Sequence, residues 1–166
     1  MKIKYSILIA FSVLVASAFS IKSMHTEKVL STKETKVWTS LEEAVALSQK
    51  DQKKILVDIY TDWCKWCKVM DKQTFSQTEM ADYLSKNYHL AKFNAEQKEV
   101  VSFNGKKYNF QKNGRRGYHE FAAEALDGRL AYPSLVIFDT NLNKLDVIRG
   151  YKTPEELMQI LKKSDS

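Results

Sequence analysis

Cysteine is scarce in this sequence, which has two, Cys64 and Cys67, among its 166 residues. Without a third cysteine the pair cannot belong to a larger framework of structural disulfides, so its partner in exchange must be another molecule. No cysteine lies near the N-terminus, and we therefore expect no lipid-modified N-terminus of the bacterial kind. Internal repeats and low-complexity tracts are also absent from the sequence.

Histidine is equally scarce, with three residues, and this bears on metal binding. Cys64 and Cys67 could supply half of a zinc site, which His89 or His119 would have to complete. No His-x-x-x-His spacing is present to do so. We therefore expect no metal and no cofactor, and we interpret His119 as an ordinary surface or half-buried residue on a helix.

Positive charge is in excess, with a formal net charge of +6, but the acidic residues are interspersed with the basic ones. Nucleic-acid binding requires basic residues gathered on one face, together with aromatic or groove-entering elements. We therefore exclude nucleic acid as a partner. One local basic cluster, which a solvated loop surface explains more simply than an acidic partner does, comprises Lys106, Lys107, Lys112, Arg115 and Arg116.

The N-terminus differs in kind from the rest of the chain. Lys2 and Lys4 precede an apolar run over residues 7–16, which ends in the small residues Ala16-Ser17-Ala18. A short basic region, an apolar stretch of about 10 residues and small residues before the cut are typical of a secretory signal peptide. We expect residues 1–20 to be this signal peptide.

An uncleaved membrane anchor is the alternative, but the apolar run is shorter than the roughly 20 residues that span a bilayer. Residues 21–35 are polar and lack apolar periodicity, which is typical of a flexible leader. One folded domain then occupies residues 36–163. We expect the protein to be exported, either to a periplasm or as a secreted protein.

Strand and helix patterns alternate through this domain. The nearly continuous apolar run at 55–60 indicates a strand buried on both faces, and Thr153 before Pro154 marks the start of a last helix. We expect helices at 41–50, 64–70, 77–86, 118–126 and from 154 onward, a break at 74–76, and strands at 37–38, 55–60, 89–94, 134–138 and 144–149.

An additional segment, residues 98–118, separates the strands at 89–94 and 134–138. Asn104-Gly105 lies between two alternating stretches, which is a strong signal for a β-hairpin, expected around residues 99–110. Residues 113–117 are expected to form a loop.

The two cysteines lie in Trp63-Cys64-Lys65-Trp66-Cys67-Lys68, directly after the strand at 55–60. A Cys-x-x-Cys pair at a junction between a strand and a helix is a device for moving two electrons between thiols and disulfides. This pattern predicts redox chemistry on the sulfur atoms themselves.

Residues Ile55–Lys68 closely resemble the active-site segment of thioredoxins. Lys92, Tyr132-Pro133 at the place of a thioredoxin cis-proline, and Gly150 extend the resemblance over about residues 36–163. Exported members are the most similar, among them the C-terminal periplasmic domain of the transmembrane thiol-disulfide interchange reductase. The resemblance implies an α/β thioredoxin fold, in which helices flank both faces of a central mixed β-sheet, with the inserted hairpin near the active-site side.

The resemblance also implies roles for individual residues. Cys64, at a helix N-terminus that favours a thiolate, is the attacking residue. Cys67, one turn deeper and shielded from solvent, resolves the mixed disulfide. Asp58 matches the buried acid that acts as general base toward the resolving thiol, and Lys92 matches the lysine beside that acid. A solvent-facing Asp58 and a plain surface Lys92 are the alternatives.

Substrate binding is expected around the thiols. Trp63 and Trp66 are candidates for an apolar docking rim, with simple packing as the alternative. Residue statistics favour a trans Tyr132–Pro133 bond, whereas the resemblance implies a cis bond that places the Tyr132 backbone opposite Cys64. Lys65-Trp66, in place of the usual Gly-Pro, leaves the redox potential open, and the insertion at 98–118 leaves the partner open.

These features predict an extracytoplasmic thiol-disulfide oxidoreductase that reduces protein disulfides through a Cys64–Cys67 dithiol. A disulfide oxidase or isomerase, and a non-catalytic binding module with the thioredoxin fold, stay open as alternatives. The expected partners are disulfide-containing client proteins and a membrane protein that supplies electrons to the Cys64–Cys67 disulfide.

Overall fold

The structure is a computed structural model that describes residues 38–164. The signal peptide expected at 1–20 and the leader expected at 21–35 lie outside the described residues, as does Val37. Among residues 38–164, no helix has both the length and the apolar character needed to cross a membrane.

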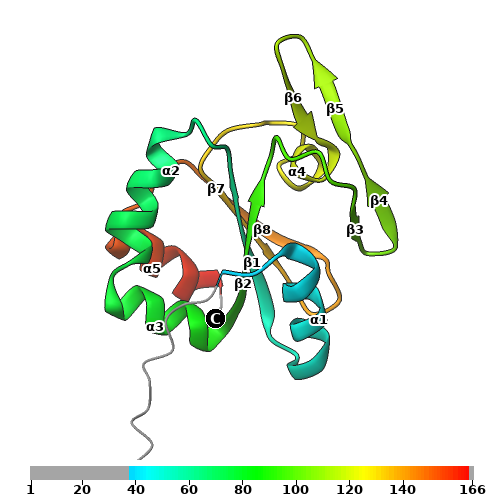
Figure 1. Cartoon of the computed structure of the whole chain (residues 1–166). Coiled ribbons are helices and arrows are strands. Elements are labelled where there is room, and N and C mark those ends of the chain that lie inside the picture. The colour runs from blue at the N-terminus through cyan, green and yellow to red at the C-terminus, as the bar shows by residue number, and fades with distance from the viewer. Residues whose placement is uncertain (1–37, 165–166) are drawn as a thin grey trace, which may run out of the picture. The chain divides into compact units, whose positions relative to one another are not determined.

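A four-stranded mixed sheet lies at the centre of the domain (Figure 1). β1 and β2 are parallel, whereas β7 runs antiparallel to both β1 and β8. Since β1 is an inner strand with helices above and below it, its five central residues are all buried, as its apolar run predicts. The strands, in the order β2-β1-β7-β8, are β2 (Tyr88–Asn94), β1 (Lys54–Tyr60), β7 (Ser134–Phe138) and β8 (Lys144–Arg149).

Helices cover both faces of this sheet, and each face has its own apolar core. One face carries α2 (Lys65–Met70), the π-helical segment η1 (Asp71–Phe75), α3 (Thr78–Asn87) and α5 (Pro154–Ser164), which contribute Met70, Phe75, Met80, Leu84, Leu157 and Leu161 to its core. The other face carries α1 (Leu41–Asp51) and α4 (Glu120–Ala125), which contribute Leu41, Ala44, Phe121, Ala122 and Ala125.

The break expected at 74–76 lies at 76–77, because α2 continues through η1 as far as Phe75. The Thr74 hydroxyl donates to the carbonyl of Lys152 at 2.6 Å, so this side chain is used in a tertiary contact and does not end the helix. Phe75 packs edge-on against Trp38, with 5.1 Å between ring centroids. Of the strand expected at 37–38, only Trp38 is described and it is not in a strand; the next residue, Thr39, forms an isolated parallel bridge to Ala91.

The insertion folds into two hairpins (Figure 1). The first, β3 (Val101–Phe103) and β4 (Lys106–Tyr108), confirms the expected hairpin. Its turn residues Asn104 and Gly105 have φ of 49° and 74°, which a two-residue turn of this kind requires. The second, β5 (Phe110–Asn113) and β6 (Arg116–His119), replaces the loop predicted at 113–117, and that prediction is wrong.

Gly117 explains why a second hairpin forms here. A Cβ atom at this position would lie 2.1 Å from Cζ of Phe110 and 2.5 Å from the carbonyl oxygen of Gln111. Only glycine therefore allows the Phe110 ring to lie across β6. The strand extends to His119, so α4 begins at Glu120, two residues later than the sequence predicts.

His119 is fully buried, which corrects its expected place on the surface of a helix. It caps α4, where its Nδ1 accepts the Phe121 N–H at 3.2 Å. Its ring packs edge-on against Phe93, with 5.0 Å between centroids. The end of the insertion is thus fixed to the core beneath β2.

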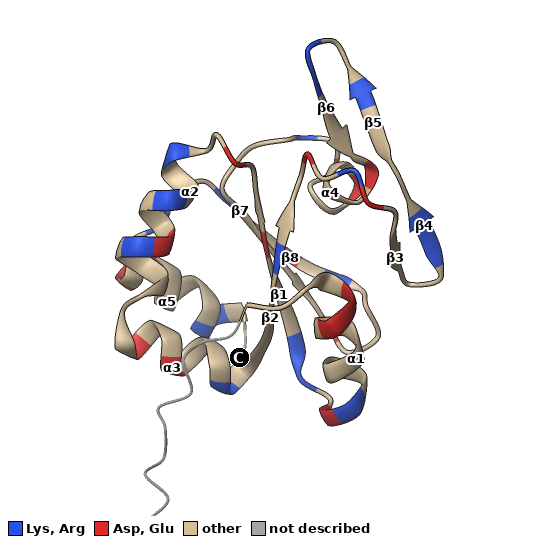
Figure 2. Ribbon diagram, viewed as in Figure 1, with Lys and Arg blue, Asp and Glu red and all other residues tan. Residues whose placement is uncertain are grey.

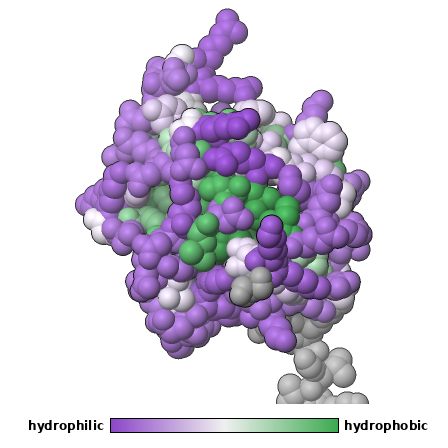
Figure 3. Space-filling view, turned by 180° about the vertical axis from the view of Figure 1, so that it is seen from behind, coloured by the Kyte–Doolittle hydropathy of each residue, from purple (hydrophilic) through white to green (hydrophobic). Residues whose placement is uncertain are grey.

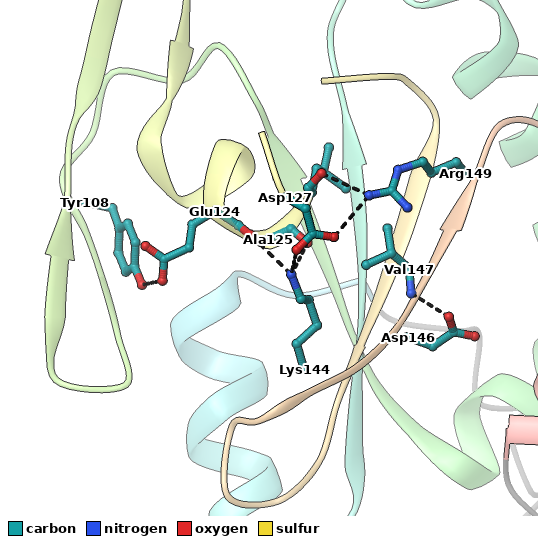
Figure 4. A network of polar contacts seen from close by, with 9 residues as sticks. Tyr108, Glu124, Ala125, Asp127, Lys144, Asp146, Val147 and Arg149 are labelled. Atoms are coloured by element: carbon teal, nitrogen blue, oxygen red, sulfur yellow. Dashed lines mark hydrogen bonds and ion pairs between the residues drawn. The ribbon is translucent and has the colours of Figure 1, made fainter. Parts of the chain in front are cut away.

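A polar network ties α4 and the insertion to the edge strand β8 (Figure 4). Tyr108 donates to Glu124 at 2.7 Å, and Lys144 forms an ion pair with Asp127. Arg149 donates to the Leu126 carbonyl at 2.9 Å and to Asp127 at 3.2 Å. From the opposite side of the molecule, an apolar area is visible within an otherwise polar surface (Figure 3).

Candidate active site

The end of β1 delivers the chain to the cysteines. Cys64 is the N-cap of α2, and its N–H donates to the Thr61 carbonyl at 3.1 Å. Cys64 and Cys67 are joined by a disulfide, with 5.3 Å between their Cα atoms. The N–H of Cys67 donates to Sγ of Cys64 at 3.1 Å. Negative charge that develops on the Cys64 sulfur therefore meets a backbone donor from the first helical turn.

Cys67 is shielded from solvent as expected, at 4 % exposure, and in the disulfide form Cys64 is equally buried at 4 %. The disulfide draws the Cys64 side chain against the first turn of α2. The two sulfurs still differ in their surroundings. Sγ of Cys64 accepts the Cys67 N–H, whereas Cys67 lies inside the helix and supplies that donor.

Asp58 lies in β1 beneath α2, and its expected burial is confirmed at 2 % exposure. Side chains alternate along a strand, so Asp58 shares the face of Leu56, which packs in the core with Met70 of α2. Lys92 is its direct neighbour across the parallel pair β1–β2. Nζ of Lys92 lies 3.1 Å from Oδ2 of Asp58.

A second carboxylate, from Asp71 at the start of η1, also binds Lys92. Nζ of Lys92 lies 2.6 and 2.7 Å from the two carboxylate oxygens of Asp71. The rings of Trp38 and Tyr60 flank the ammonium group at 5.3 and 5.2 Å. Burial by itself lowers the pKa of Lys92, but the attraction of Asp58 and Asp71 outweighs it and raises the pKa above 10.5. Lys92 is therefore a cation held between two acids.

Two tryptophans flank the disulfide and stay accessible: Trp63 is 49 % exposed and Trp66 is 60 % exposed. The indole N–H of Trp63 donates to Glu96 at 3.0 Å. The guanidinium of Arg116 lies 4.3 Å from the centroid of the Trp63 ring. Trp66 contacts the Tyr151 ring at 5.3 Å. Each ring is therefore held by neighbouring side chains and still exposes about half of its surface or more.

The Tyr132–Pro133 bond is cis, as the resemblance implies. The Tyr132 ring packs edge-on against Trp63, with 6.1 Å between centroids. Burial, and to a smaller extent the negative charge of Glu96, raises the pKa of Tyr132 to about 12. Tyr132 is thus a neutral side chain that joins the cis-proline segment to the rim of the disulfide.

The histidines weighed as metal ligands are engaged elsewhere. His89 is hydrogen-bonded to Asp51 at 2.8 Å, and His119 lies in the core against Phe93. In the described part of the chain, no group of three or more His, Cys, Asp or Glu side chains is arranged to hold a metal ion.

The arrangement of a cysteine pair at a helix start with a buried acid below it is matched by a known family. A family model described as a thioredoxin-like domain matches residues 41–165. The chain belongs to the thioredoxin-like family. The mixed sheet with helices on both faces is the thioredoxin fold, which confirms the expected fold class.

This thioredoxin-like chain is also similar to a curated relative and to several solved structures. Over 44 residues it is 41 % identical to the thiol:disulfide interchange protein DsbD of Pseudoalteromonas atlantica. That match covers 26 % of this chain and 7 % of the relative, so the chain spans only a small part of the relative's length.

Among solved structures, a thioredoxin from Thermus thermophilus is similar, with a TM-score of 0.58, 15 % identity, and coverage of 78 % of this chain and 86 % of that one. The oxidised C-terminal domain of DsbD from Neisseria meningitidis has a TM-score of 0.53, 14 % identity and coverage of 77 % and 99 %. At these identities the likeness establishes the fold.

The structure of this thioredoxin-like domain brings together the residues that the sequence singles out and adds Asp71 and Glu96, which it does not, and Arg116, which the sequence places only in a basic cluster. Asp71, Glu96 and Arg116 contact Lys92 or Trp63. Asp71 follows Cys64 by seven residues, two helical turns, and this spacing is a usable signal. Glu96, in the turn after β2, and Arg116, at the start of β6, carry no such pattern.

We expect Lys92→Met to lower the free energy of unfolding by about 3 kcal/mol at pH 7, because it removes the ammonium partner of the buried Asp58. Folding raises the Lys92 pKa above its ordinary 10.5. The contribution is therefore complete below that pH and is lost as pH rises through the raised value. Urea unfolding of the disulfide form should show a constant difference from wild type between pH 7 and about 10 that shrinks above this range.

Asp71→Asn is the matched control. Its carboxylate is 40 % exposed, and the variant keeps the Lys92–Asp58 pair, so we expect a loss of about 1 kcal/mol or less. Equal losses in the two variants would contradict a special role for the buried pair.

Proposed function

We propose that this thioredoxin-like protein is a thiol-disulfide oxidoreductase that reduces disulfides of client proteins outside the cytoplasm. The observation that carries this proposal is the Cys64–Cys67 disulfide at the start of α2, with the Cys67 N–H directed at Sγ of Cys64. The signal-like segment at 1–20 supports the location.

The reaction uses the two sulfurs in sequence. In the reduced protein, the Cys64 thiolate attacks a client disulfide, which forms a mixed disulfide and releases the first client sulfur as a thiolate. Cys67 then loses its proton and attacks Sγ of Cys64. This step forms the Cys64–Cys67 disulfide and releases the second client thiol, so two electrons pass to the client.

Asp58 acts in the second step as the general base that takes the proton of Cys67. Its carboxylate is buried beneath α2, and Lys92 holds it in the ionised form that can accept a proton. Lys92 also binds Asp71, so its ammonium group keeps a carboxylate partner while Asp58 is protonated. Because Asp71 remains as the partner of Lys92, protonation of the buried Asp58 does not leave the ammonium group without a counter-charge.

The exposed rim binds the client. Trp63 and Trp66 offer apolar faces beside the sulfurs, and the Tyr132 backbone is the partner for an extended client segment. Because each cycle leaves Cys64 and Cys67 oxidised, a donor must return two electrons. A membrane protein is the class of donor that fits a protein working outside the cytoplasm, and a family likeness to DsbD agrees with it.

Trapping tests the proposal directly. Cys67→Ala should accumulate mixed disulfides through Cys64, because the resolving thiol is missing. Captured proteins, purified without reductant, released with dithiothreitol and identified by mass spectrometry, should be enriched in disulfide-bonded exported proteins. The matched control is the double variant with Cys64→Ser, which should capture none. Unselective capture, or full biological activity of Cys64→Ser alone, would favour a non-catalytic binding module.

Asp58→Asn should slow the resolving step by about 10²-fold at pH 7, because the amide cannot accept the Cys67 proton. Rapid-quench measurement of a preformed mixed disulfide gives this rate, which should recover as rising pH ionises Cys67 without help. The attack by Cys64 should change little, and Asp71→Asn, which keeps Asp58 as the base, should slow resolution far less than Asp58→Asn does. Equal slowing of both steps would argue against the base.

The direction of electron flow is tested by equilibration with glutathione. A reductant should have a reduction potential below about −180 mV, so that its dithiol remains able to reduce client disulfides. The ratio of oxidised to reduced protein, measured by thiol alkylation across a series of glutathione buffers, gives the potential. A value well above this limit would assign the protein to the oxidases or isomerases.

A further inference from the structure

We call the β5–β6 hairpin, Phe110–His119, the arm. Its turn lies at the same end of the domain as the start of α2 (Figure 1). Its base is firmly held. Glu120 accepts the Asn109 N–H at 2.7 Å and the Gln111 side-chain amide at 2.6 Å. The His119 N–H donates to the Ala95 carbonyl at 2.7 Å. With the base fixed in this way, the arm presents its turn residues in a defined direction.

The arm reaches the rim of the disulfide through Arg116. Arg116 places its guanidinium over the Trp63 ring at 4.3 Å, and Trp63 directly precedes Cys64. Glu96 and Tyr132 hold the other sides of that ring. Cation–π contacts at exposed sites contribute little to stability, so the main effect of this contact is to fix a positive charge beside the sulfurs.

Further positive charge surrounds this position. Figure 2 shows basic residues at the turn of the arm and along the first turns of α2. None of these exposed side chains forms an ion pair with another described residue. By contrast, Lys106 of β4 pairs with Glu124, and Lys144 of β8 pairs with Asp127. The exposed basic residues of the arm and of α2 are Lys112, Arg115, Arg116, Lys65 and Lys68.

The acids nearest to this surface are already engaged. Asp62 accepts from the Asn94 amide at 3.1 Å, and Glu96 accepts from Trp63. Glu99 accepts the backbone N–H of Lys98 at 3.1 Å. Their charges reduce the positive field, but the five exposed basic residues outnumber these three acids.

We propose that the arm determines specificity, and that it selects client disulfides whose flanking residues are acidic. This inference rests on the proposed function, because it concerns the same sulfurs. The acidic client segment lies against the turn of the arm and the first turn of α2 while Cys64 attacks. Arg116 binds a client carboxylate with its planar guanidinium, and the complementary charges speed encounter and orient the client.

The test compares three substrates of the reduced protein. Two are peptides with one internal disulfide that differ only in flanking residues, glutamate in one and lysine in the other; the third is the small uncharged bis(2-hydroxyethyl) disulfide. We expect wild type to reduce the glutamate peptide with a kcat/KM about tenfold above that for the lysine peptide at low salt. The preference should fall as ionic strength rises.

Arg116→Gln should reduce this preference about threefold to fivefold, and Arg116→Lys, which keeps the charge but loses the planar group, should reduce it less. The matched control is Lys107→Gln, which removes the same charge from an exposed side chain of β4. Its preference should equal that of wild type, because Lys107 belongs to the other hairpin.

Two results would overturn the specificity role while leaving the proposed function standing: equal kcat/KM for the two peptides, or equal losses in Arg116→Gln and Lys107→Gln, each with reduction of the uncharged disulfide retained. Arg116-dependent binding to phosphatidylglycerol vesicles without peptide preference would also overturn it, in favour of a lipid surface. Absence of activity on all three disulfides would instead contradict the proposed function itself.

Discussion

The ammonium group of Lys92, held between Asp58 and Asp71, is the interaction on which the site depends. It joins β2 to β1 and to the helical segment that continues from the cysteines. Removing charged groups from water is expensive, and this arrangement offsets that penalty by giving one cation two anionic partners and two flanking aromatic rings. The buried acid can therefore exist beneath α2 without destabilising the sheet.

Local signals predict much of this structure. The apolar run of β1 and the spacing of the cysteines identify the inner strand and the reactive turn, because both depend on neighbouring residues in the chain. The burial of Asp58 follows in the same way, since a polar residue inside a strand of buried apolar residues is buried with them. The cis bond before Pro133 follows only from likeness to thioredoxins, because residue statistics favour trans.

Contacts between distant segments are the part that sequence patterns do not predict. Arg116 meets Trp63 across more than fifty residues, and Asp71 of η1 reaches Lys92 of β2. The second hairpin is an intermediate case. Asn113-Gly114 carries the same turn signal as Asn104-Gly105, but the flanking polar residues hide the alternation that would identify strands. Its pairing depends instead on the absence of a side chain at Gly117.

The anchoring of the arm at its base has a consequence for how such a protein can diversify. Glu120, Gly117 and His119 hold the hairpin at its base, and Gly114, with φ of 59°, allows its turn. The exposed side chains of Lys112 and Arg115 can therefore be replaced without disturbing the turn or the cysteine pair on α2. Under the proposed specificity role, a change of charge at these two positions would alter which clients are favoured and leave the cysteine pair as it is.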